Sequence, residues 1–143
     1  MVARFCLLSA GAFFLIGLLA GAWKYAHIAT RADARAPVYV DIAHRASLMY
    51  GFACALIGQL SVGSAWSERT NFIAAIVLVA FFAVTIFGYV VHGLLQDTEN
   101  QLERPHKLGK RQIPAAAMLV FMGALMVGEI GAFATILSGY AMR

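Results

Sequence analysis

Four long apolar runs, almost free of charged residues, divide this chain. They are Phe5–Trp23, Ala46–Trp66, Phe72–Leu95 and Ile113–Met142. Each is long enough to cross a hydrocarbon core of about 30 Å as a helix, which takes about 20 residues. None alternates apolar with polar positions as a strand would, and backbone polar groups cannot stay unpaired in lipid. The pattern therefore predicts an all-α fold: an integral membrane four-helix bundle. We expect a single domain over residues 1–143, with helices near 4–29, 38–64, 68–96 and 112–142.

The composition agrees with this prediction, because 62% of the residues are hydrophobic, 13% are charged and the mean hydropathy is +0.77. A soluble domain is about half apolar and a quarter charged. The first run also resembles a signal peptide, with Arg4 ahead of it and Ala20-Gly21-Ala22 at its end. Its apolar stretch of about 19 residues exceeds the usual 7–15. We therefore expect a retained helix.

Lysine and arginine are unequally distributed between the two ends of the predicted bundle. Antiparallel helices place the first and third loops on one side, and eight basic residues lie there: Lys24, Arg31, Arg35, Arg45, Arg104, Lys107, Lys110 and Arg111. The other side has three: Arg4, Arg69 and Arg143. By the positive-inside rule, we expect loops 1 and 3 in the cytoplasm and both termini outside, in a bacterial-type inner membrane. The basic segment 107–111 is then a topology anchor, and we expect no nucleic-acid partner.

Small residues recur within two of the runs. Gly17 and Gly21 form a GxxxG pair, and Gly128 and Gly131 lie together in the last run. Such residues let helix backbones approach closely in lipid. These small residues are at least as well explained by packing within this bundle as by a contact between subunits of an oligomer. The two cysteines, Cys6 and Cys54, fit no disulfide or zinc spacing and are expected to be small buried hydrophobes.

Polar side chains gather in the cytoplasmic halves of the second and third predicted helices, where ionisable groups are costly in lipid. On the second helix, Asp41, His44 and Ser47–Leu48 share one face at i, i+3, i+4 spacing. The third helix carries a similar stripe: Thr85, Tyr89, His92 and Gln96. We expect an antiparallel hairpin to bring the two stripes together. The last run carries one acid, Glu129.

The histidines differ in their surroundings. His27 and His106 lie in or beside loops and are expected to be solvated. His44 and His92 are flanked by apolar residues, and a buried imidazole commonly binds a metal or haem or relays protons. From spacing alone, His44 as a haem or metal ligand and His44 as a structural partner of Asp41 remain equal alternatives. Asp41 also fits a simple i, i+4 pair with Arg45. HExxH, CxxCH and phosphate-binding glycine motifs are all absent.

Two segments resemble a known family. Ile42-Ala43-His44-Arg45-Ala46-Ser47-Leu48-Met49-Tyr50-Gly51 resembles the second-helix motif of the styrene oxide isomerases, small membrane enzymes with four helices. Phe87-Gly88-Tyr89 resembles their third-helix motif, and the two patterns align without a gap from His44 to Tyr89. The hydroxylaminobenzene mutases share the same general layout. Helices 1 and 4 agree only in architecture.

The resemblance implies a site. His44 would be the axial ligand of haem b, at an interface between subunits of a homotrimer, and the ferric iron would act as a Lewis acid on an epoxide oxygen. Tyr89 would position the substrate or the opened intermediate. The family has an asparagine six residues after the histidine, where this chain has Tyr50, which either donates to a bound oxygen or fills the pocket. The segment 97–101 has no counterpart in the family.

The sequence is therefore compatible with three functions. The first is a haem b-dependent intramolecular isomerase that rearranges a small lipophilic substrate drawn from the lipid bilayer, with His44 on the iron and Tyr50 and Tyr89 as catalytic residues. The second is a haem-binding electron-transfer or sensory subunit, ligated by His44 and His92, without isomerase activity. The third is a haem-free assembly or channel-like protein, in which Asp41, His44 and Glu129 are polar contacts between helices.

Overall fold

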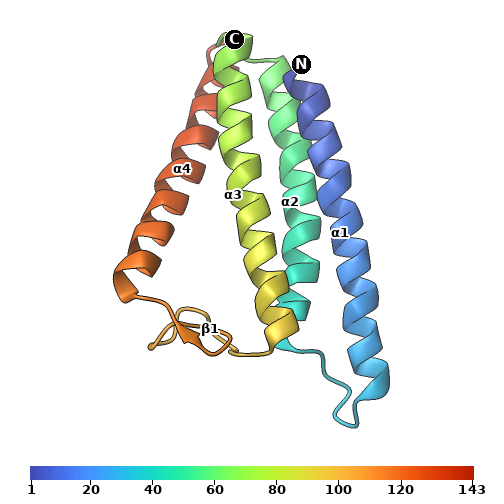
Figure 1. The fold of residues 1–143 in the computed structure, drawn as a ribbon. Coiled ribbons are helices and arrows are strands. Elements are labelled where there is room, and N and C mark those ends of the chain that lie inside the picture. Colours follow the sequence, from blue (N-terminus) through green and yellow to red (C-terminus); the bar gives the residue numbers. More distant parts are fainter.

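The computed structural model describes all residues, 1–143, and is 76% helical. Its helices are α1 (Val2–Thr30), α2 (Val38–Val62), α3 (Glu68–Leu95) and α4 (Ala115–Ala141), each antiparallel to the next (Figure 1). Three of them, α1, α3 and α4, are long and apolar enough to cross a membrane. The first turns of α2 are more polar, because Asp41, His44 and Arg45 lie there. The chain is thus all-helical, as predicted, with three candidate membrane spans.

The helix boundaries follow local sequence signals. Pro37 and Pro114 are the N-caps of α2 and α4. Ser67 caps α3, because its side chain accepts a hydrogen bond from the Thr70 N–H. At its other end α3 stops at Gln96, which adopts the left-handed conformation with φ of 47°. Such conformations are common at helix C-termini because they allow the last carbonyls to be capped.

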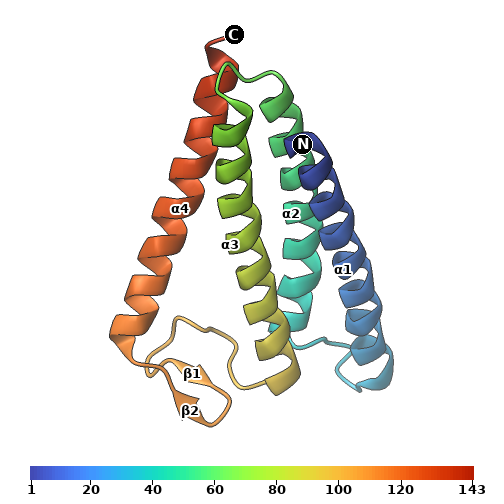
Figure 2. The ribbon, with the colours of Figure 1, turned by 45° about the horizontal axis from the view of Figure 1, so that its top comes forward.

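The third loop contains a short hairpin that the hydrophobic pattern does not predict. Strands β1 (Lys107–Leu108) and β2 (Arg111–Gln112) pair antiparallel around a turn at Gly109, whose φ is 61° (Figure 2). Two-residue strands are too short for an alternating pattern to reveal them. The hairpin lies at the end of the bundle where α3 stops and α4 begins, beneath these two helices (Figure 2).

Helices α1 and α2 pack closely through small residues. A Cβ added at Gly51 would lie 3.1 Å from the Ala10 carbonyl oxygen, and one at Gly58 would lie 2.9 Å from the Cys6 Cβ. A Cβ added at Gly17 would lie 2.6 Å from the Leu48 side chain. The glycines therefore let α1 and α2 approach each other within one chain, as small residues do in membrane helices. This supports intramolecular packing as the role of Gly17.

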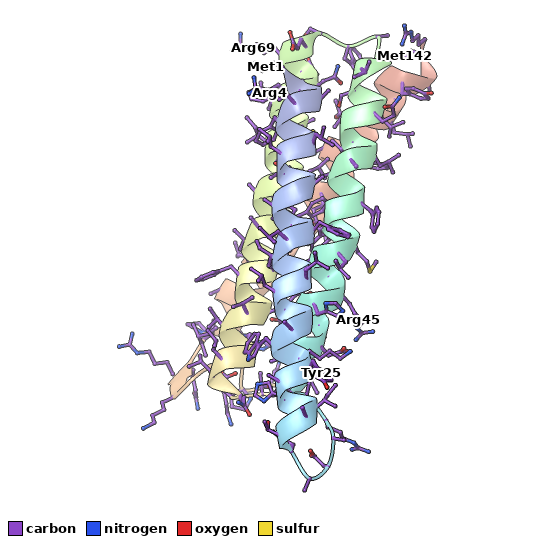
Figure 3. The ribbon with its side chains drawn as sticks, turned by 90° about the vertical axis from the view of Figure 1, so that its right-hand side faces the viewer. Met1, Arg4, Tyr25, Arg45, Arg69 and Met142 are labelled. Atoms are coloured by element: carbon purple, nitrogen blue, oxygen red, sulfur yellow. The ribbon has the colours of Figure 1, made fainter.

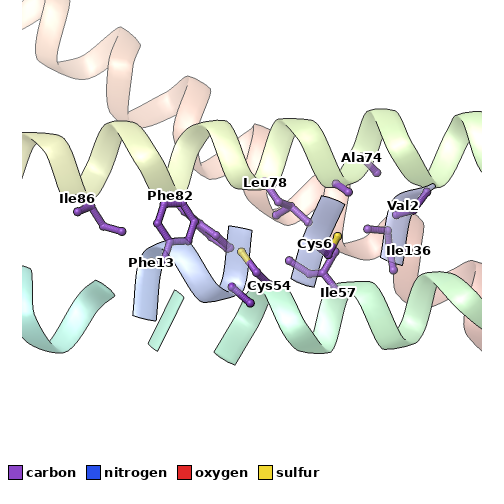
Figure 4. Packing of buried hydrophobic residues seen from close by; sticks show 12 residues of the cluster. Val2, Cys6, Phe13, Cys54, Ile57, Ala74, Leu78, Phe82, Ile86 and Ile136 are labelled. Atoms are coloured by element: carbon purple, nitrogen blue, oxygen red, sulfur yellow. The ribbon is translucent and has the colours of Figure 1, made fainter. Parts of the chain in front are cut away.

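The buried apolar core joins all four helices (Figure 4). Its members are Val2, Cys6, Ala10 and Phe13 of α1, Cys54 and Ile57 of α2, Ala74, Ala75, Leu78, Phe82 and Ile86 of α3, and Ile136 of α4. Both cysteines are free and buried, which confirms their role as small hydrophobes.

Helix α4 is attached mainly at one end. Near its C-terminus it meets the α2–α3 turn, where the Ala65 N–H donates to the Gly139 carbonyl at 2.8 Å and the Trp66 indole N–H donates to Ser138. From there α4 diverges from α3 toward Ala115 (Figures 1 and 2). Only Ile136 and Gly139 of this helix are buried. Ala132 and Phe133 are partly buried against the core, whereas Leu119, Val120, Val127 and Ile130 are exposed.

Apart from Glu129, in the middle of α4, the charged groups lie toward the two ends of the bundle. Loops 1 and 3 share one end, called here the loop end, and both chain termini lie at the other (Figure 1). Arg4 and Arg69 are near the termini, whereas Tyr25 and Arg45 lie toward the loop end (Figure 3). The expected grouping of loops 1 and 3 is therefore correct.

Candidate functional site

His44 is oriented by a backbone carbonyl. Its Nδ1 lies 2.8 Å from the Gly17 carbonyl oxygen of α1. Because a carbonyl oxygen only accepts hydrogen bonds, Nδ1 must carry the proton, and Nε2 then has a free lone pair. Gly21 makes room for the ring, since a Cβ there would lie 2.8 Å from the imidazole Cε1. This tautomer and fixed orientation are what a histidine ligand of a metal requires.

Asp41 does not orient His44, which corrects one expectation from the sequence. Its carboxylate is 2.6 Å from Lys24 Nζ on α1 and 2.8 Å from the Arg45 guanidinium. Two cations satisfy the carboxylate, and the imidazole proton already has the Gly17 carbonyl as acceptor. The expected i, i+4 pair with Arg45 is present.

The two polar stripes do not meet. The α2 stripe faces α1, because Asp41 binds Lys24, His44 binds Gly17 and Leu48 contacts Gly17. The face of α2 turned to α3 instead carries Tyr39 and Tyr50. Periodicity identifies which residues share a face, but it does not identify the neighbouring helix that the face meets. The prediction that the stripes come together is therefore wrong.

Tyr50 and Tyr89 do share a site. They line a cavity of about 130 Å³ between α2, α3 and α4, called here the inner cavity. The Tyr50 ring also stacks on Phe82, with centroids 4.2 Å apart. The cavity is bounded by Tyr50, Val84, Thr85, Gly88, Tyr89, Gln101, Phe121, Met122 and Leu125. An apolar cavity of about 150 Å³ is known to hold benzene, so this space suits one small ring.

Two buried polar atoms near the inner cavity have no hydrogen-bond partner within the chain. One is Thr85 Oγ1, on the cavity wall, and the other is Glu129 Oε1 on α4. Glu129 lies one helical turn beyond Leu125, a residue of the cavity wall. Buried polar groups normally have a partner, so unpaired ones mark a place where a ligand or water can bind.

A second cavity of about 600 Å³, the outer cavity, lies between loops 1 and 3 at the loop end. Here His92 Nδ1 is 2.8 Å from Asp97 Oδ1, and each side chain is only 6% exposed. The Gly109 N–H donates to the other Asp97 oxygen. Burial opposes ionisation of Asp97, but the hydrogen bonds from His92 and Gly109 outweigh it and hold the pKa of this carboxyl below its ordinary value.

His44 and His92 occupy different surroundings. His44 contacts α1, whereas His92 contacts Asp97 and the Tyr39 ring, whose centroid is 5.0 Å away. A single chain therefore does not present both imidazoles to one iron. His106 also departs from expectation, because it is buried and its Nδ1 lies 3.3 Å from the Gln101 carbonyl oxygen. The third loop folds over it, which its position in a charged segment does not reveal.

Tyr39, Asp97 and Gln101 contribute to these cavities, and no sequence pattern singles them out. Tyr39 lies near the start of α2 and is only 4% exposed. Asp97 and Gln101 lie in a polar loop, and only the tertiary structure places Gln101 against the inner cavity. No protein family, curated protein or solved structure matches this chain.

Proposed function

We propose that this protein is a membrane-embedded, haem b-dependent isomerase that rearranges a small lipophilic oxygen-bearing substrate. The observation that carries the proposal is the hydrogen bond from His44 Nδ1 to the Gly17 carbonyl, which leaves Nε2 free as a ligand. The resemblance of the His44 and Tyr89 segments to the styrene oxide isomerases supports the same assignment.

In this proposal all four helices cross a bacterial inner membrane, with the loop end in the cytoplasm. Large apolar side chains are exposed along every helix, among them Leu19, Phe52, Phe87 and Val127. Exposed apolar surface of this extent is unfavourable in water and favourable in lipid. Asp41 and Arg45 lie in the first two turns of α2, close enough to the cytoplasmic interface for the arginine to reach it.

The site fits a single imidazole ligand: His44 would hold the haem iron through Nε2, and Gly21 leaves the ring its space. When bound, ferric haem supplies a Lewis-acidic iron that polarises an oxygen of the substrate. His44 faces α1, whereas Tyr50 and Tyr89 face the inner cavity. The complete site therefore needs His44 from one copy and the inner cavity from another, consistent with the expected homotrimer.

Tyr50 and Tyr89 have defined tasks in this mechanism. Both line a cavity whose size suits one ring, so they can orient the substrate and donate a hydrogen bond to oxygen as a C–O or N–O bond breaks. On the α4 side, Phe121, Met122 and Leu125 supply an apolar wall against which the hydrocarbon part of the substrate would pack.

The first test is haem content. His44→Ala should remove most haem from the purified protein and leave its helicity intact, whereas the control His27→Ala should retain haem. Tyr50→Phe and Tyr89→Phe should retain haem yet lower turnover of aryl epoxides or aryl hydroxylamines by about 10²–10³, the usual effect of losing such a donor. Wild-type haem content in His44→Ala would refute the assignment. A low-spin bis-histidine spectrum without turnover would support the electron-transfer or sensory function instead.

A further inference from the structure

The walls of the inner and outer cavities are in direct contact at one point. Tyr39 forms part of the outer cavity wall, and Gln101 forms part of the inner cavity wall. These two residues are joined directly, because the Gln101 backbone N–H donates to the Tyr39 hydroxyl. This hydrogen bond therefore lies between the polar cavity at the loop end and the more apolar cavity within the bundle.

Tyr39 is placed to act on both cavities. Its ring lies 5.0 Å from the His92 ring, which lines the outer cavity, and 5.9 Å from the Tyr89 ring, which lines the inner one. It is stacked on Tyr89, so the aromatic contacts hold the ring while the hydroxyl holds Gln101. Loss of the hydroxyl alone would release the loop and leave the ring packing unchanged.

The segment carrying Gln101 is attached to the helices at few points. Asp97 connects it to His92 of α3 and to the hairpin through Gly109. Between Asp97 and His106 the chain has no regular secondary structure, and most of its residues are exposed. Its other hydrogen bonds are local and do not reach the helices. A segment with few contacts to the helices moves away from them at low free energy. The only hydrogen bond between this segment and α2 is the one from the Gln101 N–H to the Tyr39 hydroxyl.

A lateral route is the competing possibility. Val84 and Phe121 line the inner cavity and are also exposed on the outer surface between α3 and α4. A lipophilic molecule could reach the cavity there directly from the bilayer, whereas a charged molecule could not cross the surrounding lipid. The two routes therefore differ in the polarity of the solute that they admit.

We propose that the inner cavity exchanges small, water-soluble molecules with the aqueous phase at the loop end, through a gate formed by Tyr39 and Gln101. Substrates or products with a polar or charged group pass through the outer cavity, and the gate closes when Gln101 returns to the Tyr39 hydroxyl. Only the identity of the occupant rests on the proposed isomerase function. The gate itself requires no haem.

The test uses a cysteine in the inner cavity. Thr85→Cys is introduced into protein whose Cys6 and Cys54 are replaced by Ala, and this protein is reconstituted without haem in lipid nanodiscs. Modification is followed with a small charged methanethiosulfonate and with a neutral lipophilic maleimide. Adding Tyr39→Phe should speed the charged reagent by about threefold to tenfold, the effect of removing one hydrogen bond from the closed state. The matched control Tyr25→Phe, at a tyrosine that is 70% exposed, should leave the rate unchanged.

A second measurement does not depend on the introduced cysteine. Backbone hydrogen–deuterium exchange over residues 98–104 should quicken in Tyr39→Phe, while exchange in the middle of α3 stays at the wild-type rate. Equal charged-reagent rates in Tyr39→Phe and Tyr25→Phe, or modification by the lipophilic reagent alone, would overturn the gate and favour the lateral route. Because haem is absent, that failure would leave the haem proposal standing, and loss of haem from His44→Ala would not test the gate.

Discussion

His44 shows how one backbone contact can define the chemistry of a side chain. The Gly17 carbonyl fixes the proton on Nδ1, and Gly21 gives the ring the space that it occupies. The same two glycines form the GxxxG pair in the sequence, so a motif typical of helix packing also positions an imidazole. The role of Asp41 is different, because it neutralises Lys24 and Arg45 near the loop end.

At the residue scale, Gly21→Ala tests this arrangement. The new methyl would lie 2.8 Å from the His44 Cε1 and 2.9 Å from its Nδ1, so the ring or the helix must move. Such overpacking typically destabilises by about 1–3 kcal/mol. We expect weaker haem binding and a lower unfolding temperature, measured by haem titration and by circular dichroism in detergent.

Gly11→Ala provides the matched control on the same helix, because a Cβ at Gly11 has no atom within 4 Å. This variant should keep wild-type haem affinity and gain slightly in helix stability, since alanine favours a helix over glycine. Equal haem affinity in Gly21→Ala and Gly11→Ala would show that the position of the His44 ring is unimportant for binding.

At the scale of elements, the third loop is a folded part of the structure. The β1–β2 hairpin is joined to α3 through Asp97, whose two carboxylate oxygens accept from His92 and from the Gly109 N–H. Tyr39 joins the same loop to α2. These contacts bury His106 and place Gln101 at the inner cavity.

The loop attachment should depend on pH. The pKa of Asp97 lies below its ordinary value in the folded protein. Its stabilising contribution is therefore complete above the unfolded pKa of about 3.9 and is lost as pH falls through the folded value. At pH 7, Asp97→Asn should lower the free energy of unfolding by about 1–3 kcal/mol. This difference from wild type should shrink toward zero as pH falls from about 4 to 2. Thermal unfolding in detergent, recorded at each pH, measures it.

Asp33→Asn is the control for that experiment, because Asp33 is half-exposed and pairs only with Arg31 and a neighbouring backbone N–H in loop 1. Exposed ion pairs contribute little, so this variant should match wild type at every pH. A difference for Asp97→Asn that stays constant down to pH 2 would mean that its ionised form does not hold the loop.

For the whole molecule, the arrangement of charge and the attachment of α4 define two unlike ends. The loop end carries eight of the eleven lysine and arginine residues. Helix α4 is held at the end near the termini, by Gly139 and Ser138, and diverges where the inner cavity and the third loop lie (Figure 1). The candidate chemistry therefore lies in the half of the bundle nearer the basic loops.

The charge difference predicts the topology, which labelling can test. With loops 1 and 3 in the cytoplasm, cysteines at Arg35 or Lys107 should react with an impermeant thiol reagent only after the inner membrane is permeabilised. A cysteine at Ser67, in the opposite turn, should react in cells whose inner membrane is intact. The reverse pattern of labelling would place the basic loops outside.

The sequence by itself determined the four helices, because the length of an apolar run and the capping residues beside it are local properties. The predicted bounds lie close to those observed, with the largest difference at α4, expected from 112 and observed from Ala115. The grouping of the basic loops at one end follows from helix number alone. The family resemblance implies roles for Tyr50 and Tyr89 beside a haem, whereas residue spacing does not place the two side chains in one cavity.

Only the tertiary structure decided which neighbour each helix face meets. A period of 3.6 residues places Asp41, His44 and Leu48 on one side of α2, yet the small residues of α1 determine that this side packs against α1 and not against α3. The same holds for the third loop, since Gln101 meets Tyr39, 62 residues away in the sequence, and the hairpin folds back to place the Gly109 N–H on Asp97. Local pattern fixes the direction in which a side chain points, whereas its partner depends on the close approach of helix backbones, which is a property of the whole bundle.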